Sequence, residues 1–295
     1  MESKIKLFDI AANLADESFK PDINNVFARA KKYGVEKLLM AGTYIEDSKR
    51  SYELSLLDSD YYCTAGIHPC RATQPIVEKK TYEEYFAELE KLIENANKEK
   101  LVAVGECGLD YDKFSYADKE SQLKAFPPHF DIANKYKLPM YLHERNTGGD
   151  FCKMVKANRS KFTTGVVHSF TGPIDLMKEI VSMDLYIGVT GCSLRTEKTM
   201  DMVKEIPLDR LLLETDSPYC RIRPSWPSNK LIKTEIPRVK GKKLVPEPDA
   251  IFKDRNEPCA LVQILEIVST IKGVSKEEIA KASWNNSLKV FGITA

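Results

Sequence analysis

The chain has 295 residues, of which 43% are hydrophobic and 29% charged, and its formal net charge at pH 7 is +1. This length supports one large core or two domains, and the composition is that of an ordinary globular protein. The balanced charge excludes a general electrostatic attraction to nucleic acid, so any such binding must come from local patches.

Membrane and secretory signals are missing from the sequence. No apolar run approaches the roughly 18 residues of a membrane span, and residues 1–6 lack the apolar core of a signal peptide. The seven cysteines are odd in number and form no CxxC pair, which favours reduced thiols over a disulfide framework. We expect an intracellular protein, cytoplasmic, nuclear or both, with no membrane association and no obligate protein partner.

Short apolar runs alternate with helical patterns along the chain. Strands are predicted over 6–10, 37–41, 62–67, 101–105, 139–142, 165–167, 185–189 and 211–213. Helices are predicted over 21–33, 46–57, 82–98, 119–136 with a break or kink at Pro127-Pro128, 258–272, and 275–290, where Ser275 and Glu278 form a capping box.

This alternation argues for a parallel sheet. Eight units in fewer than 300 residues favour a closed (β/α)8 TIM barrel, with an open doubly wound sheet as the alternative. No linker divides the chain, so residues 1–295 form a single domain with a long basic segment at about 219–257. A segment of that length is either functional or disordered.

Metal-ligand residues stand where the predicted strands end. His68, His143 and His168, three of the four histidines, each follow a strand directly, as do Glu106 and the acids Glu214 and Asp216. The barrel brings these strand ends into one pocket, and buried carboxylates require a compensating charge or metal. Imidazole with carboxylate suits Zn²⁺, Mn²⁺ or Fe²⁺, and two metals sharing a carboxylate would clamp both oxygens of a displacement reaction.

Six motifs in this order resemble the signature of the TatD-type metal-dependent deoxyribonucleases, most closely their eukaryotic branch. They are Asp9-Ile10-Ala11-Ala12-Asn13-Leu14, Ala65-Gly66-Ile67-His68-Pro69, Gly105-Glu106-Cys107-Gly108-Leu109-Asp110, Leu142-His143, Val167-His168-Ser169-Phe170-Thr171-Gly172 and Glu214-Thr215-Asp216-Ser217-Pro218-Tyr219. A later Arg255-Asn256-Glu257-Pro258 is similar to a further family motif.

The resemblance implies a TIM-barrel metallohydrolase that acts on DNA phosphodiesters. It places Glu106, His143, His168 and Asp216 as metal ligands, with Glu106 bridging two ions. It implies one or two divalent ions per chain, Mg²⁺, Mn²⁺ or Zn²⁺. Asp216, Glu106 and His68 become the catalytic candidates: Asp216 orients or deprotonates the attacking water, and His68 contacts the phosphate or a water.

The chain departs from the family pattern on the first strand. Many relatives have H-x-H there, whereas this chain has Asp9 and Ala11. Asp9 could still bind a metal through oxygen and Ala11 could not, so we expect one weak metal site that favours Mg²⁺. Asn13 is a candidate oxygen ligand or substrate contact.

Other substrate-binding candidates are Arg145, which is available for a phosphate, and Arg255. Glu144 stands where relatives carry Cys, and we expect it to point out of the barrel. We interpret His129, on an outer helix, as structural.

Basic residues dominate the segment at 219–257. They are Arg221, Arg223, Lys230, Lys233, Arg238, Lys240, Lys242 and Lys243, against the acids Glu235, Glu247 and Asp249. This segment could follow a phosphate backbone, with Trp226 stacking on a base, or could be an ordinary solvated loop. We interpret Cys107, Cys192 and Cys220 as packing or loop thiols.

The sequence therefore predicts a DNA hydrolase, a 3′→5′ exonuclease with or without endonuclease activity. One alternative keeps the metals and changes the substrate to a cyclic amide, a lactone, a small phosphoester or a mischarged tRNA. A second alternative is a nucleic-acid-binding or partner-binding protein that has lost activity through the change on the first strand.

Overall fold

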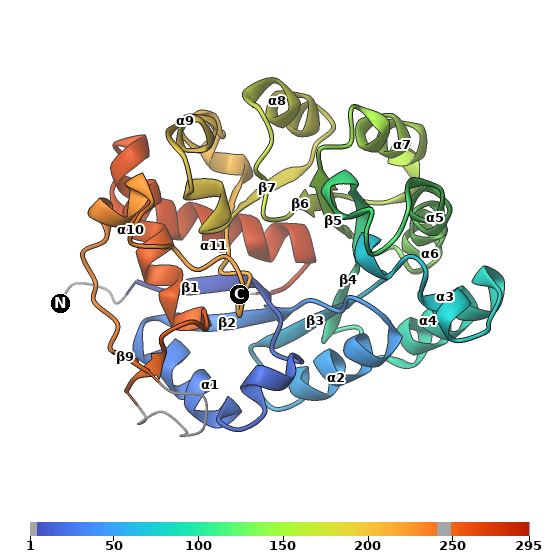
Figure 1. The fold of residues 1–295 in the computed structure, drawn as a ribbon, viewed down its shortest axis with the longest axis horizontal. Coiled ribbons are helices and arrows are strands. Elements are labelled where there is room, and N and C mark those ends of the chain that lie inside the picture. The colour runs from blue at the N-terminus through green and yellow to red at the C-terminus, as the bar shows by residue number, and fades with distance from the viewer. Residues whose placement is uncertain (1–4, 241–248, 295) are drawn as a thin grey trace.

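Eight parallel strands form the centre of the molecule in a computed structural model that describes residues 5–240 and 249–294. They pair in sequence order and form a ring (Figure 1). The strands are β1 Leu7–Ala12, β2 Val35–Met40, β3 Tyr61–Ala65, β4 Leu101–Asp110, β5 Met140–Arg145, β6 Gly165–Val167, β7 Tyr186–Val189 and β8 Leu211–Leu213.

The ring closes between β8 and β1. Asp216 donates its backbone N–H to Ala11 at 2.8 Å, and Asn13 donates its own to Ser217 at 2.7 Å. An isolated bridge between Ala12 and Ser217 completes this junction. The predicted TIM barrel is thus confirmed, in nearly closed form, over the open doubly wound sheet.

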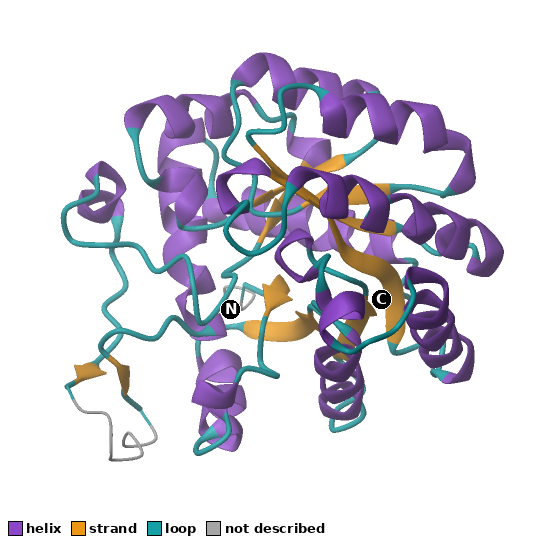
Figure 2. Cartoon of the chain, turned by 45° about the vertical axis from the view of Figure 1, so that its right-hand side comes forward, coloured by secondary structure: helices purple, strands orange, loops and turns teal. Residues whose placement is uncertain are grey.

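The helices lie around the outside of the strand ring, except that α11 Lys276–Phe291 crosses one end of it (Figure 1 and Figure 2). They are α1 Ile23–Lys32, α2 Ile45–Ser55, α3 Gln74–Val77, α4 Tyr82–Asn95, α5 Lys119–Ala125, α6 Pro127–Tyr136, α7 Asp150–Asn158, α8 Ile174–Ser182, α9 Glu197–Glu205, α10 Leu261–Lys272 and α11 Lys276–Phe291. The break predicted at Pro127-Pro128 separates α5 from α6. Ser275 caps α11 by accepting the N–H of Glu278.

The strands are buried on both faces, which explains their continuous apolar sequence. Inside the ring, large side chains such as Tyr62, Tyr141, Tyr186 and Leu212 pack with Phe291 of α11. Outside it, a second apolar cluster joins the strands to the surrounding helices. No single helix among the described residues is long and apolar enough to cross a bilayer, and only Pro258–Lys272 with Lys276–Phe291, bent by 113°, meets that test as a pair.

Strand β4 is longer than predicted because two glycines allow it to continue. The prediction ended it at Gly105, whereas the strand runs to Asp110. Gly105 and Gly108 adopt φ values of +136° and +146°, and a Cβ on either would lie 2.0 Å from a backbone oxygen of β5. Only glycine tolerates both the dihedral and the close approach. As a result, Glu106 and Asp110 lie within the strand.

The segment after β8 is folded where it is described. It contains a 3-10 turn at Pro227–Leu231 and a short parallel pair, β9 Arg238–Val239 with β10 Ile251–Phe252, which stands away from the strand ring (Figure 2). Glu266 of α10 anchors it by accepting the N–H groups of Lys233 and Thr234 at 2.8 and 3.0 Å. Lys242, Lys243 and Glu247 lie outside the described residues.

Candidate metal centre and active site

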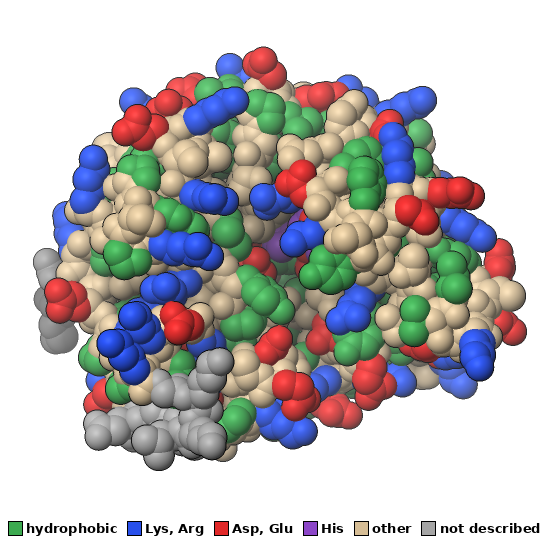
Figure 3. Space-filling view, viewed as in Figure 1, with side chains coloured by type: hydrophobic (Ala, Val, Ile, Leu, Met, Phe, Trp, Pro, Cys, Tyr) green, Lys and Arg blue, Asp and Glu red, His purple; other side chains and the backbone are tan. Residues whose placement is uncertain are grey.

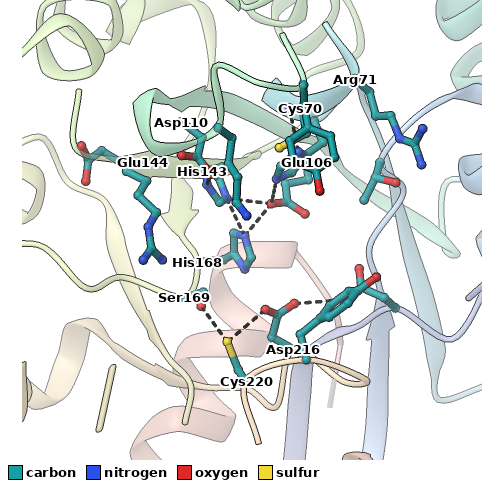
Figure 4. Close-up of a pocket in the computed structure, with 17 residues that line it drawn as sticks. Cys70, Arg71, Glu106, Asp110, His143, Glu144, His168, Ser169, Asp216 and Cys220 are labelled. Carbon is teal, nitrogen blue, oxygen red and sulfur yellow. Dashed lines mark hydrogen bonds and ion pairs between the residues drawn. The ribbon is translucent and has the colours of Figure 1, made fainter. Parts of the chain in front are cut away.

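One carboxylate oxygen forms the focus of the site. Oε1 of Glu106 lies 2.7 Å from Nε2 of His168, 2.9 Å from Nδ1 of His143 and 3.2 Å from Nε2 of His68 (Figure 4). Glu106 and His143 belong to β4 and β5, whereas His168 directly follows β6 and His68 lies in the turn after β3. The structure therefore brings these four predicted residues together at the carboxyl ends of neighbouring strands.

This donor set fits a divalent cation. The ligand atoms of His68, Glu106 and His143 lie within 4.8 Å of one another, and Nε2 of His168 lies 3.3 Å from Nδ1 of His143. Imidazole nitrogens and a carboxylate oxygen that face the same point are the ligands of Zn²⁺, Mn²⁺ and related ions.

Two of the three imidazoles have a further partner on the ring nitrogen that does not face Glu106. Nε2 of His143 lies 3.3 Å from Oδ2 of Asp110, and Nδ1 of His68 accepts the N–H of Cys70 at 3.0 Å. A carboxylate behind a histidine fixes the ring orientation and raises its basicity toward a metal. We did not anticipate this contact of Asp110, although it ends the motif that begins with Gly105.

Burial and mutual charge govern protonation in this group. Burial raises the pKa of Glu106, but the charges of His168 and His68 outweigh that effect and hold it well below the ordinary value. Burial lowers the pKa of His168, but the charge of Glu106 outweighs this and raises the pKa to about 10. Burial raises the pKa of Glu214 to about 8 despite the opposing charge of His168. Glu214 lies next to this group, with Oε1 3.8 Å from Nδ1 of His168.

Asp216 faces the pocket from the opposite side of the barrel (Figure 4). Its backbone has a φ of +53°, uncommon for a residue with a side chain. Asn13 donates to Oδ1 of Asp216 at 2.9 Å, and Asn256 donates to the carbonyls of Thr215 and Pro218 on either side of it. Burial raises the pKa of Asp216. Hydrogen bonds from Asn13 and from Asn256 thus hold the turn that carries Asp216.

Asp9 supports this turn and does not line the pocket. Its two oxygens accept the N–H and the hydroxyl of Thr215 at 2.8 and 2.6 Å. The side chain is fully buried, and this burial raises its pKa to about 7. From β1 and the loop that follows it, only Asn13 lines the pocket among the described residues. A role of Asp9 as a metal ligand stays a prediction that this contact pattern does not favour.

The two residues after His143, Glu144 and Arg145, differ in their contacts and exposure. Arg145 lines the pocket and donates to Asp112 at 2.9 Å, with 41% of its side chain exposed. Glu144 accepts from the N–H and hydroxyl of Thr147, and its carboxylate points away from Glu106 (Figure 4). Both residues line the pocket, but Arg145 is the exposed one, whereas Glu144 is buried and its carboxylate is bound to Thr147.

Arg255 lies in a buried ionic cluster and not at the pocket. It donates to Asp22 at 2.8 and 2.7 Å and to Glu257 at 2.7 Å, and Arg29 bonds to the same two acids. All four side chains are at most 6% exposed. The structure therefore places this substrate-binding candidate in a structural role that joins α1 to the segment before α10.

Two cysteine assignments need correction. Cys192 and Cys220, predicted as free thiols, form a disulfide between the loops after β7 and β8, with their Cα atoms 5.1 Å apart. Residues 28 positions apart gave no pairing signal in the sequence. The sulfur of Cys220 lies 3.3 Å from Oδ2 of Asp216. Cys107 is buried, as a packing residue should be.

The pocket above these residues has a volume of about 380 Å³, the size of a small-molecule site. Arg71, Lys113 and Arg145 line it. Figure 3 shows histidine at the bottom of this hollow with Lys and Arg side chains around it. Of the basic residues predicted along 219–257, none that the structure describes lines the pocket. Trp226 instead packs partly buried against the core.

His129 is also remote from the pocket. Its Nε2 accepts the N–H of Ile67 at 2.9 Å, and its ring packs edge-on against Phe86. Burial lowers its pKa to about 4, so the ring is neutral and structural.

A parallel eight-stranded barrel with histidines and carboxylates at its strand ends defines a TIM-barrel hydrolase of the metal-dependent type. The model of the TatD related DNase family matches residues 8–292. The chain therefore belongs to this family, and it is a hydrolase acting on ester bonds.

Individual relatives agree with this assignment. The chain is 36% identical to the Schizosaccharomyces pombe protein named deoxyribonuclease Tat-D, over 97% of this chain and 96% of the relative. It is 32% identical to the Erwinia tasmaniensis 3′-5′ ssDNA/RNA exonuclease TatD, over 97% and 100%. A solved TatD-family hydrolase from Entamoeba histolytica superimposes with a TM-score of 0.88 at 31% identity, covering 99% of this chain and all of that one.

Proposed function

We propose that this protein is a divalent-metal-dependent deoxyribonuclease that removes nucleotides from the 3′ end of DNA. The observation that carries the proposal is the convergence of three histidine nitrogens on Oε1 of Glu106 at the base of a pocket with a cationic rim. Phosphodiesters are anionic, and their hydrolysis requires stabilisation of added negative charge. The names of the relatives described above support the same substrate.

Glu106, His143, His168 and Asp216 would hold the metal, which supplies Lewis-acid stabilisation of the phosphate and lowers the pKa of a water. Asn13 fixes one oxygen of Asp216, so the carboxylate is oriented to take a proton from a water in the pocket. His68 accepts the N–H of Cys70 through Nδ1, which leaves the proton on Nε2, where it faces Oε1 of Glu106 at 3.2 Å. With that carboxylate oxygen bound to a metal, the same N–H would be able to donate to a phosphate oxygen or a water in the pocket. Each of these side chains acts from a fixed position.

The reaction adds one water to the chain end. A bond forms between the water oxygen and phosphorus, and the bond from phosphorus to O3′ breaks. The leaving O3′ takes up a proton and becomes the new 3′-hydroxyl. The products are a 5′-mononucleotide and a strand one nucleotide shorter.

The test is digestion of single- and double-stranded DNA, labelled at either the 5′ or the 3′ end, with Mg²⁺, Mn²⁺ and Zn²⁺ compared. We expect a 5′-labelled strand to shorten one nucleotide at a time and a 3′ label to be released at once as a mononucleotide. Glu106→Gln is the control for contaminating nucleases, because it leaves the pocket shape but removes the carboxylate charge. Failure on DNA with all three ions, while a lactone or a small phosphoester is hydrolysed, would contradict the proposal.

A further inference from the structure

Two exposed tyrosines line the pocket from opposite sides. Tyr116 and Tyr219 are 63% and 57% exposed, and among the most exposed large hydrophobic side chains of the described residues only these two line the pocket. Tyr116 follows β4, whereas Tyr219 follows β8. Because β4 and β8 are four strands apart in a ring of eight, the two tyrosines lie on opposite sides of the pocket mouth.

Backbone bonds fix both tyrosines in place while their rings stay open to solvent. The N–H of Tyr116 donates to Lys113 at 2.9 Å, and that of Tyr219 donates to Asp216 at 2.8 Å. The hydroxyl of Tyr219 also reaches Asp16 at 3.4 Å. A tyrosine ring combines a flat apolar body with a polar hydroxyl, which suits contact with a ligand at the mouth of a pocket. The ammonium group of Lys113 lies 5.5 Å from the centroid of the Tyr116 ring, so a cation for a phosphate stands beside a ring that could stack on a base.

The cations of the rim gather on one side. Arg71 and Lys113 come from the loops after β3 and β4, and Arg145 is the last residue of β5, so all three lie on the side of Tyr116. The opposite side carries acids: Asp16 contacts the hydroxyl of Tyr219, and Asp216 follows β8. The β3 to β5 side also carries the carboxylates of Glu106, Asp110 and Glu144. Among the described residues, the three cations are nevertheless the only Lys and Arg side chains that line the pocket, so a phosphate backbone would meet them on the side of Tyr116.

We propose that Tyr116 and Tyr219 are base-stacking residues that hold two unpaired bases flanking the phosphate to be cleaved. This inference rests on the proposed nuclease function and identifies two residues that would contact the bases of an unpaired strand. Aromatic rings combined with a cationic track bind single strands of any sequence, because every base has a flat face. A base in a duplex already stacks on its neighbours, and a duplex is too wide for a cavity of about 380 Å³.

The test measures binding without catalysis, in EDTA, by fluorescence anisotropy. The probes are a labelled thymidine ten-mer and a ten-mer of the same backbone without bases. We expect Tyr116→Ala and Tyr219→Ala each to weaken binding of the thymidine probe about 5- to 100-fold, and to change binding of the abasic probe about twofold at most. Tyr116→Phe and Tyr219→Phe, which keep the ring, should restore most of the affinity.

Phe114→Ala is the matched control. Phe114 belongs to the same loop as Tyr116 and is 46% exposed, but it packs against Tyr111 and does not line the pocket. Its replacement should leave the affinity for both probes unchanged. Equal losses on the two probes, or no loss for either alanine variant, would overturn the stacking role.

The outcome is separable from that of the proposed function. If base-dependent binding through the tyrosines is found but no metal ion supports DNA hydrolysis, the nuclease proposal fails, and the tyrosines are base-binding residues of a site that does not cleave DNA. If DNA is hydrolysed but the wild-type protein binds both probes equally, the stacking role fails alone.

Discussion

The two halves of the site are built from different atoms. The half on β3 to β6 contributes three imidazole nitrogens around Glu106. The half on β8 and β1 contributes only oxygen and amide groups, Asp216 and Asn13. Each half has a buried carboxylate behind it: Asp110 contacts His143, and Asp9 holds the turn of Asp216 through Thr215. The comparison suggests that the first half binds a metal tightly and the second half binds one weakly.

The largest effect on metal content and activity should follow from removing one of the histidine ligands. His143→Ala and His168→Ala should each eliminate tightly bound metal and lower kcat/KM about 1000-fold or more, because Lewis-acid stabilisation contributes several kcal/mol. The measurements are elemental analysis after dialysis and nuclease kinetics. His129→Gln should show the reverse pattern, a lower stability with metal content and kcat preserved in the folded fraction. Full metal content and activity in both alanine variants would refute the ligand assignment.

An intermediate effect is expected at Asp9. Asp9→Ala removes the acceptor of the buried N–H of Thr215 and leaves its hydroxyl only the longer bond to Ala11 at 3.4 Å. This loss should lower the free energy of unfolding by about 1–3 kcal/mol. Because the turn of Asp216 loosens, kcat should fall about 10- to 100-fold while tightly bound metal remains. Urea unfolding, kinetics and elemental analysis check these points. An unchanged stability with a much higher Mg²⁺ requirement would instead place Asp9 in the metal site.

The smallest effect is expected at Ala11, on the oxygen-only half. We expect the purified protein to retain about one metal ion per chain after dialysis, since the second half lacks enough ligands to hold another. Ala11→His adds a nitrogen donor and should lower the Mn²⁺ concentration for half-maximal activity, by about tenfold at most. Two ions that survive dialysis of the unchanged protein would show that the halves do not differ.

The sequence predicted the barrel and the nitrogen half well because both depend on local patterns. Apolar runs locate the strands, and a histidine that follows a strand must lie at that strand's end. The extension of β4 was not predicted, because Gly105 resembles a strand terminus until its contact with β5 is known. The burial of Arg255 could not be predicted either, since its partner Asp22 lies 233 residues away in the chain.

The hydrogen bonds of Asn256 bear on how much the length of the segment after β8 can vary. Its N–H and side chain bond to Pro218 and Thr215, and Arg255 beside it is tied to α1 through Asp22. Both ends of the segment from Tyr219 to Arg255 are therefore held beside Asp216 by hydrogen bonds and ion pairs. The entropic cost of closing a loop rises only slowly with its length. We therefore expect that insertions and deletions within this segment would leave the position of Asp216 unchanged.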